Sequence, residues 1–408
     1  MSNVVERFKK YALIDTQAND TKESFPSNEN ELFLAEMLEE ELKEIGVEDV
    51  TVDEYAFLYA RIPSNIDKGV PSIVFLAHMD TVPCLPGNNI NIVTTSRYDG
   101  GDIVLNPNKG IILSPDDYPV LKKYIGHDIL TSDGTTVLGA EGKAGIAEIM
   151  EAVKHLYHHP EIKHGEIYIC FTPDEELQKD RRYINLKKIP AKYGYTVDEG
   201  ELGEINYENF NAATVTIHIK GTSIHPGKAK SKMINAVMIA SKFISMLPPQ
   251  ETPNNTSGYE GYYHVESMVG CVEECRMNLM LRDFSEDGYK YRKNRICQIA
   301  GFLNDYYGEG VVKVSISDYY LNAKSKIEEF PELIGIAESA MKKAGIEPVV
   351  KPIRGGTYGM LLSFNGLPTP NIFSGCHNEM SPLEFISCTA MEKAVEVIIN
   401  ICKTFAEK

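Results

Sequence analysis

The chain has 408 residues, of which 43% are hydrophobic and 24% charged, and its formal net charge is −17 at pH 7. This length exceeds what one simple core supports, so two domains are expected. The acidic excess argues against nucleic acid or an anionic membrane as the main partner. No apolar run approaches the roughly 20 residues that cross a bilayer. The eight cysteines lack a repeated short spacing, which favours reduced thiols and a cytoplasmic location.

The first half of the chain alternates helical and extended patterns. Apolar residues recur at helical spacing near the amino terminus, in Glu31–Val47 and in Gly142–His159. Between and after these segments lie apolar strand candidates, namely 49–63, 72–80 and 166–176, with a long loop region expected after residue 83. Apolar strands that alternate with helices indicate an α/β fold with a mainly parallel sheet covered on both faces.

A different pattern begins near residue 211. Its order is strand 212–220, helix 233–247, strands 262–272 and 275–284, helix 288–307 and strand 311–320. This β-α-β-β-α-β order is the ferredoxin-like arrangement and is self-contained. We therefore expect residues 210–322 to form an α+β domain inserted into a domain made of residues 1–209 and 323–408. The chain then returns to a helix near 328–344, a short strand near 348–352 and a final helix.

The apolar stretch Ile73–Pro83 ends abruptly on His78 and Asp80. Side chains at i and i+2 of a strand point to the same side, so this imidazole and carboxylate can meet just beyond the carboxyl edge of a sheet. Open α/β sheets bind ligands at that edge, and a histidine held by a carboxylate is a common metal ligand. An ordinary turn at a strand end is the more common reason for such a pair, so the metal hypothesis needs donors from other segments.

Three further acidic clusters lie where strands end or helices begin. Glu141 opens a helix, residues 174–176 follow one apolar strand, and Asp198 follows another. Each cluster alone fits a helix cap, a turn or solvated charge. Together with His78 they supply nitrogen and oxygen donors to one sheet edge, as a paired-metal site requires. Adjacent Glu175 and Glu176 suit a division of roles, in which one binds metal and the other accepts a proton.

The motifs AHMDT, TSDGTTVLGA, FTPDEE, SIHPGKAK, RDF and PIRGGT, spread along nearly the whole chain, resemble the peptidase T family. The resemblance implies a two-zinc aminopeptidase that acts on tripeptides. It also implies a zinc-exopeptidase-like catalytic domain with an inserted lid and dimerisation domain, and a possible homodimer through that domain.

The resemblance also implies roles for single residues. His78 is similar to a ligand of the first zinc, with Asp80 orienting it and Asp198 as the carboxylate ligand of the same ion. Glu175 resembles the general base, and Glu176 the carboxylate ligand of the second zinc.

Three residues, two in the inserted domain and one after it, resemble substrate-binding residues. His225 is similar to a histidine that stabilises the oxyanion, often across a dimer interface. Arg282 and Arg354 resemble the pair near the terminal carboxylate of the peptide, a role that suits bidentate guanidinium groups.

The chain departs from the family pattern near the second metal. The family motif GADDKAG, whose first Asp bridges both ions, is here Gly139-Ala140-Glu141-Gly142-Lys143, so Glu141 takes the bridging position. In the family motif GGHNFHG the last His binds the second zinc, whereas Met380 stands there in this chain. A thioether is a poor zinc ligand, and neighbouring Glu379 is an alternative oxygen donor. Tyr358 and Glu199 are further departures.

These departures leave two hypotheses. The first is a metal-dependent aminopeptidase that releases the N-terminal residue of short peptides, with activity reduced by Glu141 and Met380. The second is a peptidase-like protein that binds peptides or a partner and hydrolyses little or nothing.

Overall fold

The computed structural model describes residues 3–408, with Asp180 described by its backbone alone. Two compact units make up the chain. The first comprises the residues up to 206 together with 326–351 and 357–408, and the second comprises 207–325 together with 352–356.

The first unit is built on an eight-stranded mixed sheet. Its strands, in spatial order, are β1 (Asp49–Val52), β2 (Leu58–Ile62), β8 (Ile167–Thr172), β3 (Ile73–His78), β9 (Tyr193–Asp198), β16 (Asn371–Phe373), β10 (Glu204–Asn206) and β15 (Val349–Val350). The central strands β8, β3, β9 and β16 run parallel to one another, while β1 and β2 pair antiparallel with their neighbours. Strand β10 pairs antiparallel with β16 and parallel with β15. The predicted mixed, mainly parallel sheet is confirmed.

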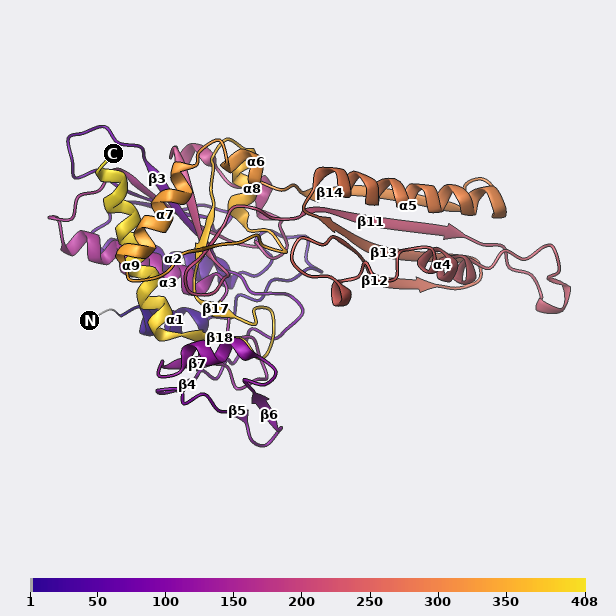
Figure 1. Ribbon diagram of the computed structural model, residues 1–408, viewed down its shortest axis with the longest axis horizontal. Helices are drawn as coiled ribbons and strands as arrows, with labels where there is room; N and C mark the ends of the chain where they lie inside the picture. Colours follow the sequence, from indigo (N-terminus) through magenta and orange to yellow (C-terminus); the bar gives the residue numbers. More distant parts are fainter. Residues whose placement is uncertain (1–2) are drawn as a thin grey trace. The chain divides into compact units, whose positions relative to one another are not determined.

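Helices pack on both faces of this sheet. The helices of the unit are α1 (Val4–Ala12), α2 (Asn30–Ile45), α3 (Lys143–His158), α7 (Glu332–Lys343), α8 (Tyr358–Phe364) and α9 (Cys388–Ala406), with the short α6 (Lys324–Ile327) at the boundary between the units. Ile73, Phe75 and Ala77 of β3 face a core that α1, α2, α3, α7 and α9 complete. The alternate residues Val74 and Leu76 pack with α8 on the other face. Figure 1 shows α3 and α9 beside the sheet.

The region after residue 83 is not the long loop that the sequence predicted. It contributes β4 (Val93–Thr95), the hairpin β5 (Ile103–Asn106) and β6 (Ile111–Leu113), the 3₁₀ helix η1 (Pro119–Tyr124) and β7 (Ile129–Thr131). Strands β4 and β7 join β17 (Cys376–His377) and β18 (Phe385–Ser387) in a separate four-stranded sheet. These strands are two to four residues long, too short for alternation to reveal them.

The second unit has the predicted ferredoxin-like order. Its elements are β11 (Asn211–Lys220), α4 (Ala236–Ser245), β12 (Tyr262–Gly270), β13 (Glu274–Asp283), α5 (Glu286–Tyr307) and β14 (Val312–Tyr320). The strands form an antiparallel sheet in the order β12-β13-β11-β14. One face of this sheet packs against α4 and α5 around residues such as Ile217, Phe243 and Ile296, as Figure 1 also shows.

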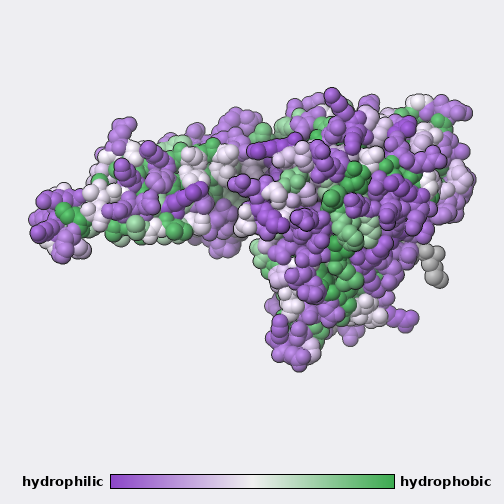
Figure 2. Space-filling model, turned by 180° about the vertical axis from the view of Figure 1, so that it is seen from behind, coloured by the Kyte–Doolittle hydropathy of each residue, from purple (hydrophilic) through white to green (hydrophobic). Residues whose placement is uncertain are grey.

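The surface reflects the high content of charged residues. Most of the face shown in Figure 2 is hydrophilic, with hydrophobic residues gathered in a band on the first unit. Within residues 3–408, no helix has the length and apolar character needed to cross a membrane.

Candidate functional site

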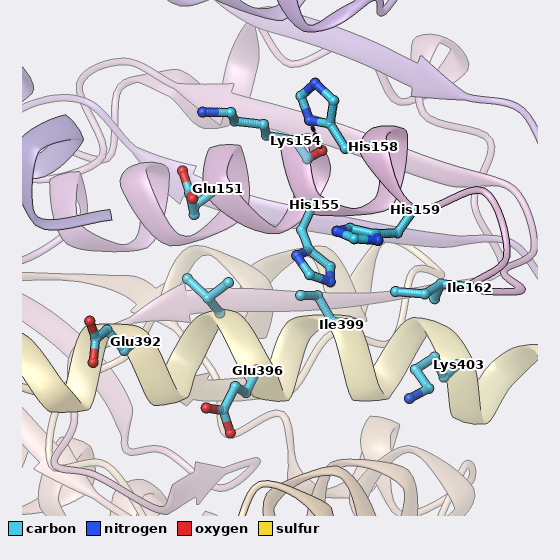
Figure 3. Close-up of a pocket in the computed structure, with 11 residues that line it drawn as sticks. Glu151, Lys154, His155, His158, His159, Ile162, Glu392, Glu396, Ile399 and Lys403 are labelled. Atoms are coloured by element: carbon cyan, nitrogen blue, oxygen red, sulfur yellow. Dashed lines mark hydrogen bonds between the residues drawn. The ribbon is translucent and has the colours of Figure 1, made fainter. Parts of the chain in front are cut away.

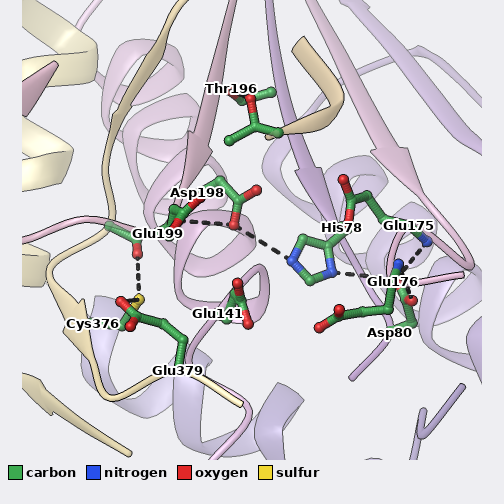
Figure 4. A network of polar contacts seen from close by, with 12 residues as sticks. His78, Asp80, Glu141, Glu175, Glu176, Thr196, Asp198, Glu199, Cys376 and Glu379 are labelled. Carbon is green, nitrogen blue, oxygen red and sulfur yellow. Dashed lines mark hydrogen bonds and ion pairs between the residues drawn. The ribbon is translucent and has the colours of Figure 1, made fainter. Parts of the chain in front are cut away.

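His78 is the last residue of β3, and both of its ring nitrogens face carboxylates. Nδ1 lies 3.3 Å from Oδ1 of Asp80, and Nε2 lies 3.5 Å from Oδ1 of Asp198. Figure 4 shows the ring between these two acids. Burial acts to lower the pKa of His78, but the charges of Asp198 and Asp80 outweigh it and raise that pKa well above its usual value. The predicted meeting of His78 and Asp80 at the strand end is therefore present in the structure.

The parallel order of β8, β3 and β9 explains why donors from distant segments meet. His78 ends β3, Asp198 ends β9, and Thr172 ends β8, so the three carboxyl ends lie at one edge of the sheet. This is the edge at which open α/β sheets place their ligands. Asp198 also accepts a hydrogen bond from its neighbour, since the backbone N–H of Glu199 donates to its Oδ1 over 2.8 Å.

Asp80 organises the turn that carries the two adjacent glutamates. The backbone N–H groups of Glu175 and Glu176 donate to its two oxygens over 3.0 and 2.9 Å. Asp80 is completely buried, and these bonds, with the contact to His78, leave its carboxylate well satisfied. One aspartate thus fixes the His78 ring and the turn at 174–176 together.

The same turn is held from its other side by the amino-terminal part of the chain. Asp174 adopts a left-handed conformation with φ +48°, and its N–H donates to Oε2 of the buried Glu31 over 2.8 Å. Its carboxylate accepts from both the backbone N–H and the hydroxyl of Ser27. No local sequence pattern predicts these contacts, because they join residues more than 140 positions apart.

Glu141 is presented by a loop that a single buried carboxylate holds. Glu384 accepts hydrogen bonds from four consecutive backbone N–H groups, those of residues 138–141, over 2.7–3.0 Å. Glu384 is 1% exposed, so these bonds are shielded from water. The sequence does not reveal this role, because an acid two positions before Ile386 carries no local signal of it.

Gly142 lets the start of α3 approach His78. Its φ is +74°, and a Cβ at this position would lie 2.5 Å from Nε2 of His78. The glycine that replaces the second family acid is therefore required by the present backbone. An aspartate side chain at residue 142 would overlap with the imidazole.

The carboxyl groups of this cluster repel one another. Burial and the charges of Glu176, Asp198 and Glu199 raise the pKa of Glu141 well above its usual value. Burial is also the main cause that raises the pKa of Glu176 well above normal and that of Glu175 to about 8. Five acids, Glu141, Glu175, Glu176, Asp198 and Glu199, thus share this region with the single imidazole of His78.

The chemistry of this donor set fits a divalent cation. One imidazole and several carboxylates are the ligands that zinc and similar metals take in proteins, and a cation would offset the repulsion among the acids. Within the described part of the chain, no three His, Cys, Asp or Glu side chains stand close enough together to surround an ion. The structure therefore shows donors gathered at one edge, while the coordination by His78, Glu141, Glu176 and Asp198 stays a prediction.

Several residues that depart from the family pattern lie together. The thiol of Cys376 donates to Oε1 of Glu379 over 3.3 Å, and Figure 4 shows both near Glu199 and Glu141. Met380 lines a small cavity with Glu141 and Glu176 and is 50% exposed. A thioether thus lies beside the two carboxylates that the sequence assigned to the second metal.

The three predicted substrate-binding residues belong to the second unit. Nε and Nη1 of Arg282 are buried without a hydrogen-bond partner, and its guanidinium stacks over Tyr320 with 4.8 Å to the ring centre. Arg354 donates to backbone oxygens of residues 256, 258 and 260. His225 is exposed, and its Nδ1 accepts from the N–H of Gly227 over 3.2 Å.

Comparisons with known proteins extend over the whole chain. Residues 207–310 match a family model described as a peptidase dimerisation domain. A protein named peptidase T from Geobacillus kaustophilus is 50% identical over 405 residues, which cover 99% of this chain and 98% of that protein. The peptidase T of Desulfitobacterium hafniense is 48% identical over 408 residues, covering 100% and 99% of the two chains.

Solved structures share the fold at lower identity. Aminopeptidase PepT from Bacillus cereus has a TM-score of 0.75 and 24% identity, covering 99% of this chain and 98% of that one. A tripeptidase from Staphylococcus aureus has a TM-score of 0.78 and 20% identity over the full length of both chains. A Bacillus subtilis protein described as a dinuclear metal-binding peptidase has a TM-score of 0.66 and 13% identity, covering 99% and 98%. Given the close relatives and their coverage, the chain belongs to the peptidase T family.

Proposed function

We propose that this protein is a metal-dependent aminopeptidase that releases the N-terminal residue of short peptides, tripeptides in particular. The observation that carries the proposal is the position of His78 between Asp80 and Asp198 at the carboxyl edge of the sheet, within a cluster of acids. Support comes from relatives named peptidase T at 48–50% identity and from a similar fold in an aminopeptidase and a tripeptidase.

Two ions, with zinc as the expected metal, are proposed for this cluster. His78 and Asp198 would hold the first ion, Glu176 would bind the second, and Glu141 would contact both. A bound divalent cation supplies Lewis acidity, which polarises a carbonyl and makes a water molecule a stronger nucleophile at neutral pH. Asp80 keeps the His78 ring in place through Nδ1, so that Nε2 would be the ligand atom.

Glu175 is proposed as the group that moves the proton. Glu175 precedes Glu176 in the turn whose N–H groups donate to Asp80, and a carboxylate beside a metal-binding residue can accept a proton from water and return it. Peptide hydrolysis requires both steps, since water loses a proton on attack and the departing amine gains one. The bond from its N–H to Asp80 fixes the backbone of this residue.

Arg282 is proposed to bind the terminal carboxylate of the peptide. Its buried Nε and Nη1 have no hydrogen-bond partner in the described structure, and a guanidinium with free, desolvated donors is suited to a carboxylate. The role of Arg354 at the same carboxylate stays a prediction, because its donors contact backbone oxygens of residues 256–260.

His225 is proposed to donate a hydrogen bond to the oxyanion. Since its Nδ1 accepts from Gly227, the neutral ring carries its proton on Nε2, which is then a donor. The match of residues 207–310 to a dimerisation domain supports a homodimer. A cytoplasmic location stays a prediction from the scattered cysteines.

Hydrolysis of matched peptides tests the proposal. We expect the protein to release the first residue of a tripeptide with a free amino terminus, in the presence of Zn²⁺, Mn²⁺ or Co²⁺, and to leave the N-acetylated peptide intact. Glu175→Gln should remove this activity by a factor of at least ~100, the usual contribution of a general base. Glu329→Gln, an isosteric change at an exposed residue, is the matched control. Equal activity of the Glu175 and Glu329 variants would exclude the proposed role of Glu175.

The alternative is a peptidase-like protein that binds peptides without cleaving them. Two observations favour it, namely the thioether of Met380 beside Glu141 and Glu176 and the lack of a closely grouped donor triple among residues 3–408. Tripeptide binding without release of product at any metal concentration would support this alternative.

A further inference from the structure

A cavity of about 670 Å³ lies away from the acidic cluster, on the surface of the first unit. One wall is the second half of α3 and the residues that follow it, and the other wall is α9. Figure 3 shows His155 and His159 on the first wall and Glu396 and Ile399 on the second. The proposed peptidase function makes no use of this cavity.

His155 and His159 are arranged as a pair. His155 lies in the last turn of α3, and His159 is the first residue after the helix. Their ring centres are 4.3 Å apart, with an angle of 31° between the ring planes. In Figure 3 both rings lie at the cavity. His158 differs from them, since its Nδ1 is bound to the carbonyl oxygen of Lys154 over 2.9 Å and its ring points away from the pair.

Glu161 orients one member of the pair. Nδ1 of His159 lies 3.0 Å from Oε1 of Glu161. A carboxylate on one ring nitrogen fixes the ring and increases the basicity of the other nitrogen, as is found repeatedly behind metal-bound histidines. This contact leaves Nε2 of His159 available to a ligand.

We propose that His155 and His159 form a binding site for a divalent transition-metal ion, separate from the acidic cluster. Two imidazoles whose ring centres lie 4.3 Å apart can bind one such ion, since imidazole is a common ligand of these metals. Since no three potential ligands are closely grouped among the described residues, the protein supplies two imidazoles and water fills the remaining positions. The carboxylate of Glu396 also lines the cavity, where it is paired with Lys393 over 2.8 Å.

The neighbouring cations limit the strength of this site. Lys154 and Lys403 also line the cavity, and their charges oppose a bound cation. We therefore expect modest affinity, highest for Cu²⁺ among the divalent first-row ions because imidazole complexes follow the Irving–Williams order.

Cu²⁺ binding to the full-length protein, followed by electron paramagnetic resonance and by calorimetric titration, tests the site. We expect a bound ion whose spectrum reports two nitrogen ligands, one from each imidazole. The acidic cluster has the single imidazole of His78, so the number of nitrogen ligands distinguishes the two places. His155→Ala/His159→Ala should lose this spectrum and one equivalent of bound Cu²⁺, whereas His158→Ala should retain both.

Two results would overturn the inference. One is a double variant that keeps the two-nitrogen spectrum and the same stoichiometry. The other is loss of the signal in His158→Ala to the same extent as in the double variant. The pair His155→Gln/His159→Gln, which preserves side-chain bulk at these surface positions, should reproduce the loss. Tripeptide hydrolysis is measured alongside, and its outcome does not bear on the copper result.

Discussion

Gly142 shows how one missing side chain shapes the site. Because a Cβ would lie 2.5 Å from Nε2 of His78 at a residue with φ +74°, Gly142→Ala should displace the imidazole from Asp198. We expect it to lower the free energy of unfolding by more than about 1 kcal/mol and to reduce hydrolysis strongly. Urea unfolding and kcat/KM for a tripeptide measure both effects.

The matched control is Gly301, a glycine whose surroundings leave room for a side chain. Gly301 lies within α5, and nothing is within 4 Å of a Cβ added there. Gly301→Ala should therefore stabilise the protein by about 0.5–1 kcal/mol, because alanine loses less conformational freedom in a helix. If Gly142→Ala and Gly301→Ala changed the free energy of unfolding equally, this result would contradict the close approach of Gly142 to His78.

Glu384 should affect both stability and activity, because its carboxylate holds the loop of residues 138–141. Replacing it with glutamine puts an amide NH₂ against backbone N–H donors and leaves some of them without an acceptor. Each buried, unsatisfied group costs about 1–3 kcal/mol, so Glu384→Gln should lower stability by about 2 kcal/mol or more. Hydrolysis should fall as well, since Glu141 lies at the end of this loop. If Glu384→Gln matched Glu329→Gln in stability and in activity, the loop would not depend on the carboxylate.

Single residues differ in how well the sequence predicts them. The contact of His78 with Asp80 follows from strand geometry, since the two residues are neighbours on one side of β3 and its extension. The roles of Glu384 and Glu31 depend on partners 143 or more positions away, and no local pattern reports such contacts. The need for Gly142 also required coordinates, because it follows from the distance to another element.

At the scale of elements, long strands and helices follow from sequence periodicity, whereas the short strands do not. The ferredoxin-like unit was predicted because its strands have nine or ten residues and alternate clearly. The sheet of β4, β7, β17 and β18 was missed, because strands of two or three residues have no detectable period. Strand β18 nevertheless matters to the site, since Glu384 lies immediately before it.

The contact between η1 and β17 predicts a pH dependence of stability. The hydroxyl of Tyr124 is hydrogen-bonded to Nε2 of His377 over 2.6 Å, and burial lowers the pKa of His377 from 6.5 to about 4. As the pH falls below 6.5, His377 takes up a proton in the unfolded chain, whereas in the folded chain it stays neutral until about pH 4. This contribution to stability is therefore complete above pH 6.5 and is lost as the pH falls towards 4.

His377→Gln isolates this effect, since glutamine accepts the same hydrogen bond and does not titrate. Between pH 7.5 and pH 5 the natural protein should lose up to about 2 kcal/mol more stability than the variant. Urea unfolding at the two pH values measures the difference, with His158→Gln as the exposed control. An equal loss in the natural protein and in His377→Gln would show that His377 does not titrate as the buried contact requires.

For the whole molecule, the fold and the broad activity could be predicted from motifs that extend from the first half of the chain to its end. The positions of the altered residues relative to one another could not be predicted. Glu141, Glu379, Met380 and Cys376 lie near one another, although Glu141 is more than 230 positions away from the others in sequence. Whether catalysis persists depends on this combination, because a shift of about 1 Å at a reacting group can cost ~100-fold in rate.

Bound metal per chain, measured together with tripeptide turnover for the natural protein and for Glu141→Asp/Met380→His, shows whether the altered site catalyses hydrolysis. We predict metal-dependent turnover by the natural protein, with more bound metal and faster turnover in the double variant. No turnover by the natural protein with Zn²⁺, Mn²⁺ or Co²⁺, together with clear turnover by the double variant, would contradict the proposed activity and would identify a peptidase fold that no longer catalyses hydrolysis.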